Sequence, residues 1–454
     1  MSESVDVVVI GMGPGGEEVA GSLAEAGLKV VGVESQLVGG ECPYWGCVPT
    51  KMMIRGADLL AEGRRIPGMA GTSTVQPEWA PIAKRIRDQA TDDWDDRVAV
   101  ERFEKKGGQF VRGLGRVSGR GLVDVDGREF RAGRGIVIST GTAAAIPPIP
   151  GLQETGYWTN RDAVKVEHLP ASLAVLGGGA IGLELAQVFA RFGVKVTVVE
   201  LFDHLLFLEE PEAGEKISKV FAAEGIDVRV GAETESVERR GDQTVLRFQD
   251  GSEVSAERLL VATGRRANLG DIGLDSIGLD PAARFVGVDD NLRAGDGVWA
   301  VGDVTGKGLF THVAMYQAAI VAADILGRKH PAADYRSLPR VTFTDPEVGA
   351  AGLTEKQARE AGINLRTGIG SVPGSARGWI HGPGNEGFHK LVEDADRGVL
   401  VGGTSMGPRG GEVMAFLQLA IHEEIPTERL RHMIYAYPTF YRGIEDALKD
   451  LAAR

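Results

Sequence analysis

Two segments of this chain repeat one pattern, in which an apolar run leads into a glycine-rich turn, a helical pattern and a second apolar run ending in glutamate. The first copy extends from Val7 to Glu34 and the second from Leu173 to Glu200. Both turns read G-x-G-x-x-G, and the glycines and final acid of one copy map onto the other with a constant offset. This order is typical of a βαβ unit that binds a dinucleotide, whereas accidental glycine turns would not share it. The sequence therefore predicts two dinucleotide-binding units.

Each residue type in the pattern has a physical task. The first glycine permits a tight turn, the second lets the backbone approach a pyrophosphate, and the third lets the helix pack on the strand. The pyrophosphate lies at the helix N-terminus, and the acid accepts a hydrogen bond from a ribose hydroxyl. The predicted binding residues are Gly11, Gly13, Gly16 and Glu34 in the first unit and Gly177, Gly179, Gly182 and Glu200 in the second.

The second unit also carries information about which dinucleotide it binds. A carboxylate at the position of Glu200 favours the free 2′-hydroxyl of NAD and repels the 2′-phosphate of NADP. The residues that follow, Leu201–His204, include no arginine that could bind such a phosphate. We therefore expect NADH rather than NADPH.

The only two cysteines, Cys42 and Cys47, lie together in the segment Gly39–Lys51. A C-x4-C pair just before a helix-like run can close into a small, reducible disulfide. Two unrelated buried thiols are the alternative. A structural zinc site would need two further ligands at metal spacing, so no metal site is predicted.

Composition and charge limit the class of protein. An apolar content of 43% and a charged content of 25% are ordinary for a soluble globular chain. The net charge of −13 argues against nucleic acid or an anionic membrane as the main partner. The acidic N-terminal residues do not resemble a signal peptide, and no apolar run reaches the roughly 18 residues of a membrane span. We expect a cytoplasmic protein, in which a disulfide is more often catalytic than structural.

Further motifs lie in the order expected for one known family. Val137–Gly141 and Val261–Arg266 are similar to its two threonine–glycine turns, and Val298–Asp303 is similar to its second flavin motif. Together with the two fingerprints and the cysteine segment, they make the chain resemble the flavin-dependent pyridine nucleotide–disulfide oxidoreductases. That family includes dihydrolipoamide dehydrogenase, glutathione reductase and mercuric reductase. The further FAD-binding positions implied are Gly40, Lys51, Gly141, Gly302, Asp303 and Thr311, and Gly264 is implied for NAD.

The resemblance implies an α/β architecture with two Rossmann-like domains, for FAD and NAD, and a C-terminal α+β dimerisation domain. The FAD-binding domain would comprise residues 1–150 and 281–338, with the NAD-binding domain at 151–280 and the interface domain at 339–454. Helices near 51–63 and 80–106 and short strands near 109–112, 115–118 and 121–125 would form an insertion in the FAD domain. A homodimer is expected.

The resemblance also implies a chemistry. Hydride would pass from nicotinamide to flavin and electrons onward to the disulfide, with Cys47 as the thiolate beside the flavin and Cys42 exchanging with substrate. A helix start near Pro49 and the nearby lysine would lower the pKa of Cys47, and the thiolate is the reactive form. Lys51 matches the family's lysine beside the flavin, and Glu184 matches its carboxylate partner.

The chain departs from the family near its C-terminus. Disulfide reductases carry a His-Pro-Thr-x-x-Glu motif there, whose histidine serves the exchange thiol as base and acid. In this chain Tyr437 and Arg442 stand at the histidine and glutamate positions. A phenol with an ordinary pKa of about 10 is a poor base at neutral pH. Another group, such as the nearby His432, is the alternative.

Two further comparisons bear on the acceptor. The tyrosine at position 437 makes this segment similar to that of mercuric reductases, but this chain lacks the C-terminal cysteine pair of those enzymes. The spacer residues Pro43–Trp45 are bulkier than is usual in the family, and either reshape the acceptor pocket or pack against neighbouring helices.

The sequence thus predicts an NADH-dependent flavoenzyme with a redox-active disulfide. Its small-molecule acceptor would need no His–Glu dyad, which points to a quinone, a metal ion or a special disulfide. A dihydrolipoamide dehydrogenase or related small-disulfide reductase is the alternative enzyme. A flavin-containing redox sensor is the alternative without catalysis.

Overall fold

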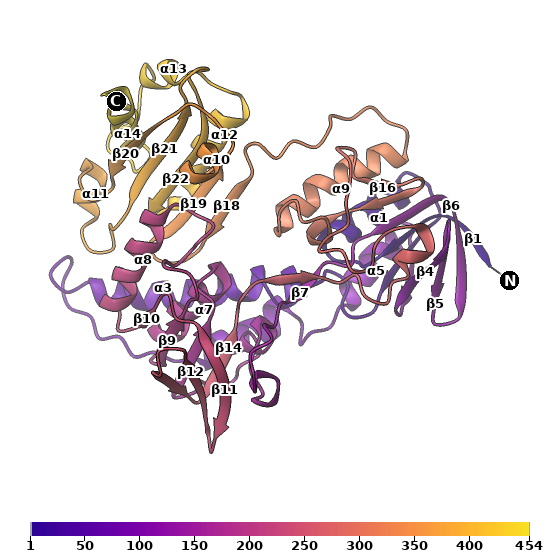
Figure 1. Cartoon of the computed structure of the whole chain (residues 1–454), viewed down its shortest axis with the longest axis horizontal. Coiled ribbons are helices and arrows are strands. Elements are labelled where there is room, and N and C mark those ends of the chain that lie inside the picture. Colours follow the sequence, from indigo (N-terminus) through magenta and orange to yellow (C-terminus); the bar gives the residue numbers. More distant parts are fainter. Residues whose placement is uncertain (1, 454) are drawn as a thin grey trace. The chain divides into compact units, whose positions relative to one another are not determined.

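The computed structural model describes residues 2–453, which cluster into two compact units. Unit 1 contains the described residues up to Pro49, together with Ala83–Ala145 and Arg265–Asp334. Unit 2 contains Thr50–Ile82, Ile146–Gly264 and the described residues from Tyr335 onward. Figure 1 labels many of the helices and strands of both. Each of the two predicted dinucleotide-binding patterns falls within a different unit.

Unit 1 is built on a mostly parallel sheet with the strand order β16-β17-β6-β1-β2-β3, and the hairpin β4–β5 pairs antiparallel with β6. The C-terminal half of β1, Val7–Ile10, and residues Val30–Val33 of β2 are fully buried, because a parallel sheet is covered on both faces. A separate antiparallel pair joins β7 (Thr142–Ala144) to β15 (Arg265–Ala267). The strands of the large sheet are β1 (Glu3–Ile10), β2 (Val30–Glu34), β3 (Gln109–Arg112), β4 (Gly115–Gly119), β5 (Leu122–Val125), β6 (Arg128–Ile138), β16 (Arg293–Gly295) and β17 (Val298–Ala300).

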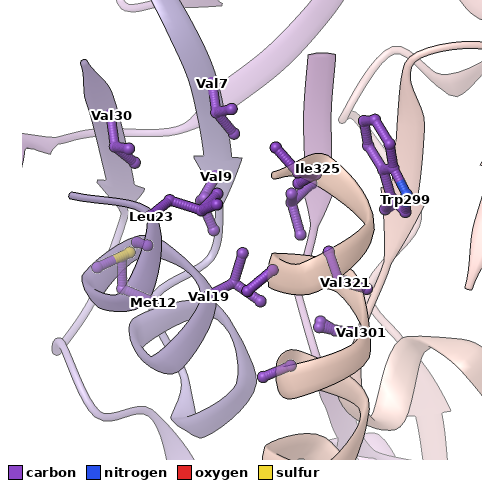
Figure 2. Close-up of a cluster of buried hydrophobic side chains, with 14 of the residues drawn as sticks. Val7, Val9, Met12, Val19, Leu23, Val30, Trp299, Val301, Val321 and Ile325 are labelled. Atoms are coloured by element: carbon purple, nitrogen blue, oxygen red, sulfur yellow. The ribbon is translucent and has the colours of Figure 1, made fainter. Parts of the chain in front are cut away.

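The core of unit 1 holds the first glycine turn in place. Helices α1 (Pro14–Glu25) and α9 (Thr311–Ile325) pack together on the sheet, and Figure 2 shows the apolar side chains between them. Burying one such side chain contributes about 1.5–3 kcal/mol. The buried cluster includes Val7, Val9, Met12, Val19, Leu23, Val30, Trp299, Val301, Val321 and Ile325.

The helical region expected near 80–106 is present but is interrupted, and α3 (Cys47–Arg65) covers the helix expected near 51–63. Helix α4 (Ala80–Arg85) continues into one π-helical turn, η1 (Ile86–Ala90), and a new helix, α5 (Arg97–Lys105), begins after a break. Residues 92–94 have φ angles of 48°, 55° and 59°, which a right-handed helix does not allow. The three short strands expected after this region are confirmed as β3, β4 and β5.

Unit 2 contains a second parallel sheet, ordered β10-β9-β8-β14, and a three-stranded antiparallel sheet, β11-β12-β13. The longest helix of residues 2–453 is α3 (Cys47–Arg65), with 19 residues, and none in that range is long and apolar enough to cross a membrane. The other elements are α6 (Asn160–Ala163), β8 (Ser172–Leu176), α7 (Ala180–Arg191), β9 (Lys195–Val199), α8 (Pro211–Ala223), β10 (Asp227–Arg229), β11 (Thr234–Arg240), β12 (Gln243–Phe248), β13 (Glu253–Ala256) and β14 (Arg258–Val261).

The C-terminal part of unit 2 is a five-stranded antiparallel sheet, β18-β19-β22-β21-β20, against which helices α12 and α14 pack. These helices supply most of a buried apolar cluster that includes Leu417, Ile444 and Leu448. The predicted α/β fold with an α+β C-terminal domain is thus confirmed. The elements are β18 (Pro339–Thr342), β19 (Glu347–Gly352), α10 (Glu355–Glu360), β20 (Leu365–Ser371), α11 (Ala376–His381), β21 (Phe388–Asp394), β22 (Val399–Gly407), α12 (Gly410–His422), α13 (Thr427–Arg431) and α14 (Gly443–Ala453).

A buried lysine joins the two parts of unit 2. Lys390 of β21 is 5% exposed, and its Nζ lies 2.8 Å from Glu210, 2.7 Å from Glu212 and 3.0 Å from Glu355. Burial alone would lower the pKa of Lys390, but its hydrogen bonds to Glu210 and Glu212 outweigh burial and raise it. The charge is therefore retained, and it connects the starts of α8 and α10 to the C-terminal sheet.

A buried histidine in β21 makes the stability of unit 2 sensitive to acid. His389 is 1% exposed, and burial lowers its pKa to about 4 from an ordinary 6.5. The imidazole of His389 binds a proton more readily in the unfolded chain than in the folded one. Neutral His389 therefore contributes to the free energy of unfolding above pH 6.5, and this contribution is lost as the pH falls towards 4. We expect acidification from pH 6.5 to 4 to lower the free energy of unfolding by about 3 kcal/mol through protonation of His389.

The measurement is the free energy of unfolding at several pH values for wild type and His389→Gln. Glutamine keeps a partner for the Ser405 hydroxyl, which lies 3.1 Å from Nδ1 of His389. Between pH 6.5 and 4 the free energy of unfolding of the variant should fall less steeply than that of the wild type, by the uptake of about one proton. Equal slopes for wild type and His389→Gln would contradict the assignment.

Candidate functional site

The first glycine turn has the geometry that its sequence predicts. Gly11 has a φ of +91°, and a Cβ there would lie 2.3 Å from the Ser139 carbonyl oxygen. A Cβ at Gly16 would lie 2.0 Å from the Gly11 carbonyl oxygen, so only glycine lets α1 pack on the turn. At Gly13, the N-cap of α1, a Cβ would meet no atom within 4 Å. The helix start therefore faces open space, in which a pyrophosphate can approach the backbone.

The second turn repeats this geometry in unit 2. A Cβ at Gly177 would lie 2.4 Å from the Ala262 carbonyl oxygen, and one at Gly182 would lie 2.2 Å from that of Gly177. Gly179 is the N-cap of α7, and a Cβ there would again meet no atom within 4 Å. Neither α1 nor α7 has a side-chain cap, so their first N–H groups can serve an anion. Both turns fit a dinucleotide.

The two strand-ending acids are held in the same way. Glu34 accepts hydrogen bonds from the backbone N–H of Met12 at 2.9 Å and of Gln36 at 2.8 Å. Glu200 accepts from Gly178 at 2.6 Å and from Phe202 at 2.8 Å. Because a carboxylate has about four acceptor sites, each acid is fixed by its own turn and can still accept from a ribose hydroxyl.

The two cysteines stand at the starts of two successive helices. Cys42 is half-buried on α2 (Glu41–Tyr44), and Cys47 is exposed at the first position of α3. The Cys47 sulfur lies 3.5 Å from the hydroxyl of Thr311, the first residue of α9. The first turn of α3 contains no acidic residue. A helix start of this kind favours the thiolate form of a cysteine.

Glycines bring this segment against the first nucleotide turn. Gly40 has a φ of +63°, and a Cβ there would lie 2.9 Å from the Cα of Gly13. The other predicted glycines, Gly141, Gly264 and Gly302, also have positive φ angles, which non-glycine residues adopt at a cost. The Gly302 N–H donates to the side chain of buried Gln317 at 2.7 Å.

The predicted flavin-motif acid, Asp303, belongs to a polar network in unit 1. It accepts a hydrogen bond from the Thr142 hydroxyl at 2.8 Å, and that hydroxyl accepts from Arg265 at 2.6 Å. Arg265 also lies 3.5 Å from Glu41, the residue before Cys42. Burial raises the pKa of Asp303. The network therefore joins the cysteine segment to Asp303, one of the residues expected to bind FAD.

The predicted lysine–carboxylate pair is present in unit 2. Nζ of Lys51 lies 2.6 Å from Glu184, whose side chain is 7% exposed. The other oxygen of Glu184 accepts from the backbone N–H of Phe343 at 2.9 Å, and Nζ of Lys51 lies 4.5 Å from the Phe343 ring centroid. The pair is thus oriented by a backbone contact as well as by charge.

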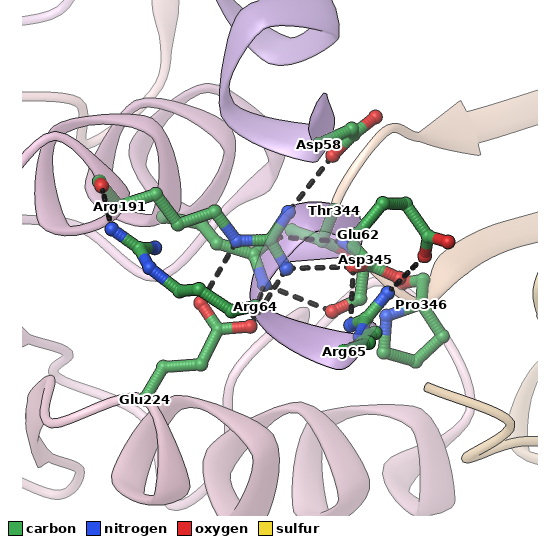
Figure 3. A network of polar contacts seen from close by, with 10 residues as sticks. Asp58, Glu62, Arg64, Arg65, Arg191, Glu224, Thr344, Asp345 and Pro346 are labelled. Carbon is green, nitrogen blue, oxygen red and sulfur yellow. Dashed lines mark hydrogen bonds and ion pairs between the residues drawn. The ribbon is translucent and has the colours of Figure 1, made fainter. Parts of the chain in front are cut away.

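Glu184 belongs to a buried polar stripe on α7. Gln187, one turn later, exchanges two hydrogen bonds with the backbone of Asp345, at 2.9 and 2.8 Å. Arg191, after a further turn, contacts Glu224 and Asp345 at 2.7 Å and Asp58 of α3 at 2.8 Å, as Figure 3 shows. The stripe fastens α3, which carries Lys51, to α7, which carries Glu184. Sequence reasoning missed Gln187 and Arg191, although their spacing from Glu184 along one helix was visible.

The segment that departs from the family is exposed. Tyr437 is 70% exposed, and the Arg442 guanidinium lies 5.4 Å from its ring centroid. Arg442 also pairs with Glu445 at 3.0 Å. The two positions that replace the dyad therefore form a cation–π contact with each other. His432 is exposed at the end of α13.

The bulky spacer between the cysteines packs inside unit 1. Tyr44 and Trp45 are 6% and 8% exposed, and the Trp45 ring stacks on Trp94 with centroids 5.8 Å apart. Of the two interpretations of the spacer, packing is therefore favoured. No motif in the chain connects Trp94 with the cysteines, so sequence reasoning missed this residue.

Two family descriptions match the chain. One, "Pyridine nucleotide-disulphide oxidoreductase", matches residues 5–318, and its "dimerisation domain" companion matches residues 338–448. Dihydrolipoyl dehydrogenase of Chlorobaculum tepidum is 33% identical over 99% of this chain and 97% of the relative. Mercuric reductase of Staphylococcus aureus is 30% identical over 97% of this chain and 81% of the relative.

Solved structures are similar over the same extent. LpdA from Mycobacterium tuberculosis has a TM-score of 0.85 at 26% identity, covering 98% of this chain and 99% of that one. The Cu(II) complex of the HOCl-induced flavoprotein disulfide reductase RclA from Escherichia coli has a TM-score of 0.83 at 25% identity, covering 99% of both chains. The resemblance inferred from the motifs is thereby confirmed over almost the whole length.

Proposed function

This chain belongs to the pyridine nucleotide-disulphide oxidoreductase family, and from that premise we propose that it passes electrons from NADH through FAD to a redox-active Cys42–Cys47 disulfide. The family consists of FAD-dependent enzymes that use NAD(P)H, so the predicted oxidoreductase class and both cofactor types are confirmed. In the proposed half-reaction, NADH, one proton and the disulfide give NAD⁺ and two thiols. One of the two thiols then releases a proton and becomes the thiolate. FAD, when bound, relays the electron pair.

The residues of this chain have separate tasks in that reaction. The glycine turns and Glu34 would hold FAD with Asp303, and the second turn and Glu200 would hold NADH. Cys47, at a helix start beside Thr311, would carry the thiolate, and Cys42 would exchange with the acceptor. The Lys51–Glu184 pair would keep a positive charge in a fixed orientation beside the flavin.

The Tyr437–Arg442 contact is the observation that carries the proposal for the acceptor. A cation now stands where the family's disulfide reductases have a carboxylate, so this segment cannot supply a histidine base held by an acid. We propose an acceptor that needs no such base: a quinone, a metal ion or a special disulfide. Relatives named mercuric reductase, and the Cu(II) complex of RclA, support including metal ions.

A second candidate is a dihydrolipoamide dehydrogenase or related small-disulfide reductase. The relative of that name from Chlorobaculum tepidum, at 33% identity, favours it. The replacement of the dyad by Tyr437 and Arg442 opposes it, because general acid–base catalysis contributes typically 10²–10⁴-fold. Under either candidate we propose a homodimer, which the dimerisation-domain match supports, and a cytoplasmic location.

The test is a steady-state screen of NADH and NADPH against lipoamide, other small disulfides, quinones, Hg(II) and Cu(II). We expect NADH to be the better donor by at least about tenfold in kcat/KM, because Glu200 repels a 2′-phosphate. Turnover with a quinone or metal ion should exceed turnover with lipoamide. Preferred turnover of lipoamide would instead establish the second candidate, and no turnover with any acceptor would favour a redox sensor.

A further inference from the structure

A strained segment lies beside the cysteines in unit 1. After the π-helical turn η1 and one further residue, Thr91, come Asp92, Asp93 and Trp94, all in the left-handed region of backbone conformation. Aspartate tolerates this region, but a bulky residue such as tryptophan is an outlier there. Such residues persist only where the surrounding structure holds them, and they are concentrated at functional sites. The contacts that hold Trp94 in this conformation therefore indicate which part of the site the strained segment supports.

Those contacts are made with the residues between the two cysteines. The Trp94 ring stacks on Trp45 at a centroid distance of 5.8 Å and an interplanar angle of 24°. Its indole N–H donates to the Tyr44 carbonyl oxygen at 3.3 Å. Tyr44 and Trp45 are both buried, so the turn that connects Cys42 to Cys47 packs against the strained segment.

The same segment also holds the chain just before the cysteines. Asp96, which is 7% exposed, accepts a hydrogen bond from the backbone N–H of Val38 at 2.6 Å. It also accepts one from Arg112 at 2.5 Å. Residues 94–96 thus contact the chain on both sides of Cys42: Asp96 contacts Val38 before it, and Trp94 contacts Tyr44 and Trp45 after it.

We propose that Trp94 is a positioning residue that holds the turn between Cys42 and Cys47 in one conformation and thereby favours closure of their disulfide. This inference rests on the proposed redox-active disulfide. Reduction by glutathione breaks the S–S bond, transfers two electrons and two protons to the cysteines, and joins two glutathione molecules as their disulfide. A turn that is already ordered loses less conformational entropy on closure, so the two thiols have a higher effective concentration.

The test is the dithiol–disulfide equilibrium of the FAD-loaded enzyme in glutathione buffers, read by alkylation and mass spectrometry. Trp94→Ala should shift the equilibrium about tenfold towards the dithiol, which equals ~30 mV for a two-electron couple. Trp94→Phe keeps an aromatic ring but cannot donate to Tyr44, and should shift it in the same direction by a smaller factor. This second variant keeps the test decisive if Trp94→Ala does not fold.

The matched control is Trp79→Phe, at a buried tryptophan outside the flavin motif. Trp79 lies in unit 2 and donates to the Val166 carbonyl oxygen at 2.6 Å, so its replacement removes a buried indole and its hydrogen bond without touching the cysteine turn. The control should keep the wild-type equilibrium. An unshifted equilibrium in both Trp94 variants, or an equal shift in Trp79→Phe, would overturn the inference while the proposed function stands. A wild-type enzyme that forms no Cys42–Cys47 disulfide would overturn both.

Discussion

Replacement of Cys47 by serine is expected to abolish the long-wavelength charge-transfer absorbance that NADH produces in the anaerobic wild-type enzyme. The band requires a thiolate beside the flavin, and Cys47 occupies the helix start that favours this form. Acceptor turnover that depends on the disulfide should fall by at least about 10³-fold, as when a covalent nucleophile is removed. The measurements are an absorbance titration with NADH and steady-state turnover with the best acceptor of the screen.

Cys42→Ser is the matched control, because it removes the same disulfide but leaves the Cys47 thiol beside Thr311. It should lose turnover to a similar extent and yet show the charge-transfer absorbance, even before NADH is added. A Cys47→Ser enzyme with wild-type turnover would show that electrons leave the flavin without the cysteines. The disulfide part of the proposed function would then be wrong.

The double variant Tyr437→His/Arg442→Glu is expected to gain about 10²-fold in kcat with lipoamide. It restores the base and the carboxylate that the family's disulfide reductases carry, and such acid–base catalysis is worth typically 10²–10⁴-fold. The gain should follow a pH profile with a pKa near the ordinary 6.5 of histidine. It is measured as lipoamide-dependent NADH turnover from pH 5.5 to 8.5.

Each single variant serves as a control for the pair. Tyr437→His alone leaves the histidine beside Arg442, whose positive charge disfavours protonation of the ring, so only a small gain is expected. Arg442→Glu alone supplies no base and places a carboxylate three residues before Glu445 on the chain. If the double variant changes lipoamide turnover less than threefold, the native site already serves a small disulfide, and the second candidate function is favoured.

The parts of the site that could be predicted from the sequence are those determined by local backbone geometry. Gly16 is required because a Cβ would collide with the Gly11 carbonyl in the same turn, and Gly11 because a Cβ would collide with the Ser139 carbonyl that follows the neighbouring strand β6; both requirements are visible in the sequence as the G-x-G-x-x-G pattern. The same holds for Gly177 and Gly182. The position of Lys51 opposite Glu184 was predicted only through the family resemblance, since 133 residues separate them.

The parts that escaped prediction depend on contacts between distant segments. The sequence predicted helical structure near 80–106 without the break, and the Trp45–Trp94 stack and the hydrogen bond to Tyr44 hold residues 92–94 out of a helix. The Glu41–Arg265 contact likewise joins residues that lie far apart in the sequence. Such long-range contacts outweigh local propensity, and no single-sequence pattern records them.

The buried lysine of the C-terminal sheet affects how freely this domain could be exchanged in evolution or in the laboratory. A separate family description covers residues 338–448, but the side chain of Lys390, in strand β21 of this domain, neutralises Glu210 and Glu212 outside it. Removing one member of a buried ion pair typically costs about 3–5 kcal/mol. A graft that brings in a foreign C-terminal domain without a cation at this position would leave the charge of Glu210, which is 2% exposed, uncompensated. Recombination at this boundary is therefore restricted to partners that carry the matching charge.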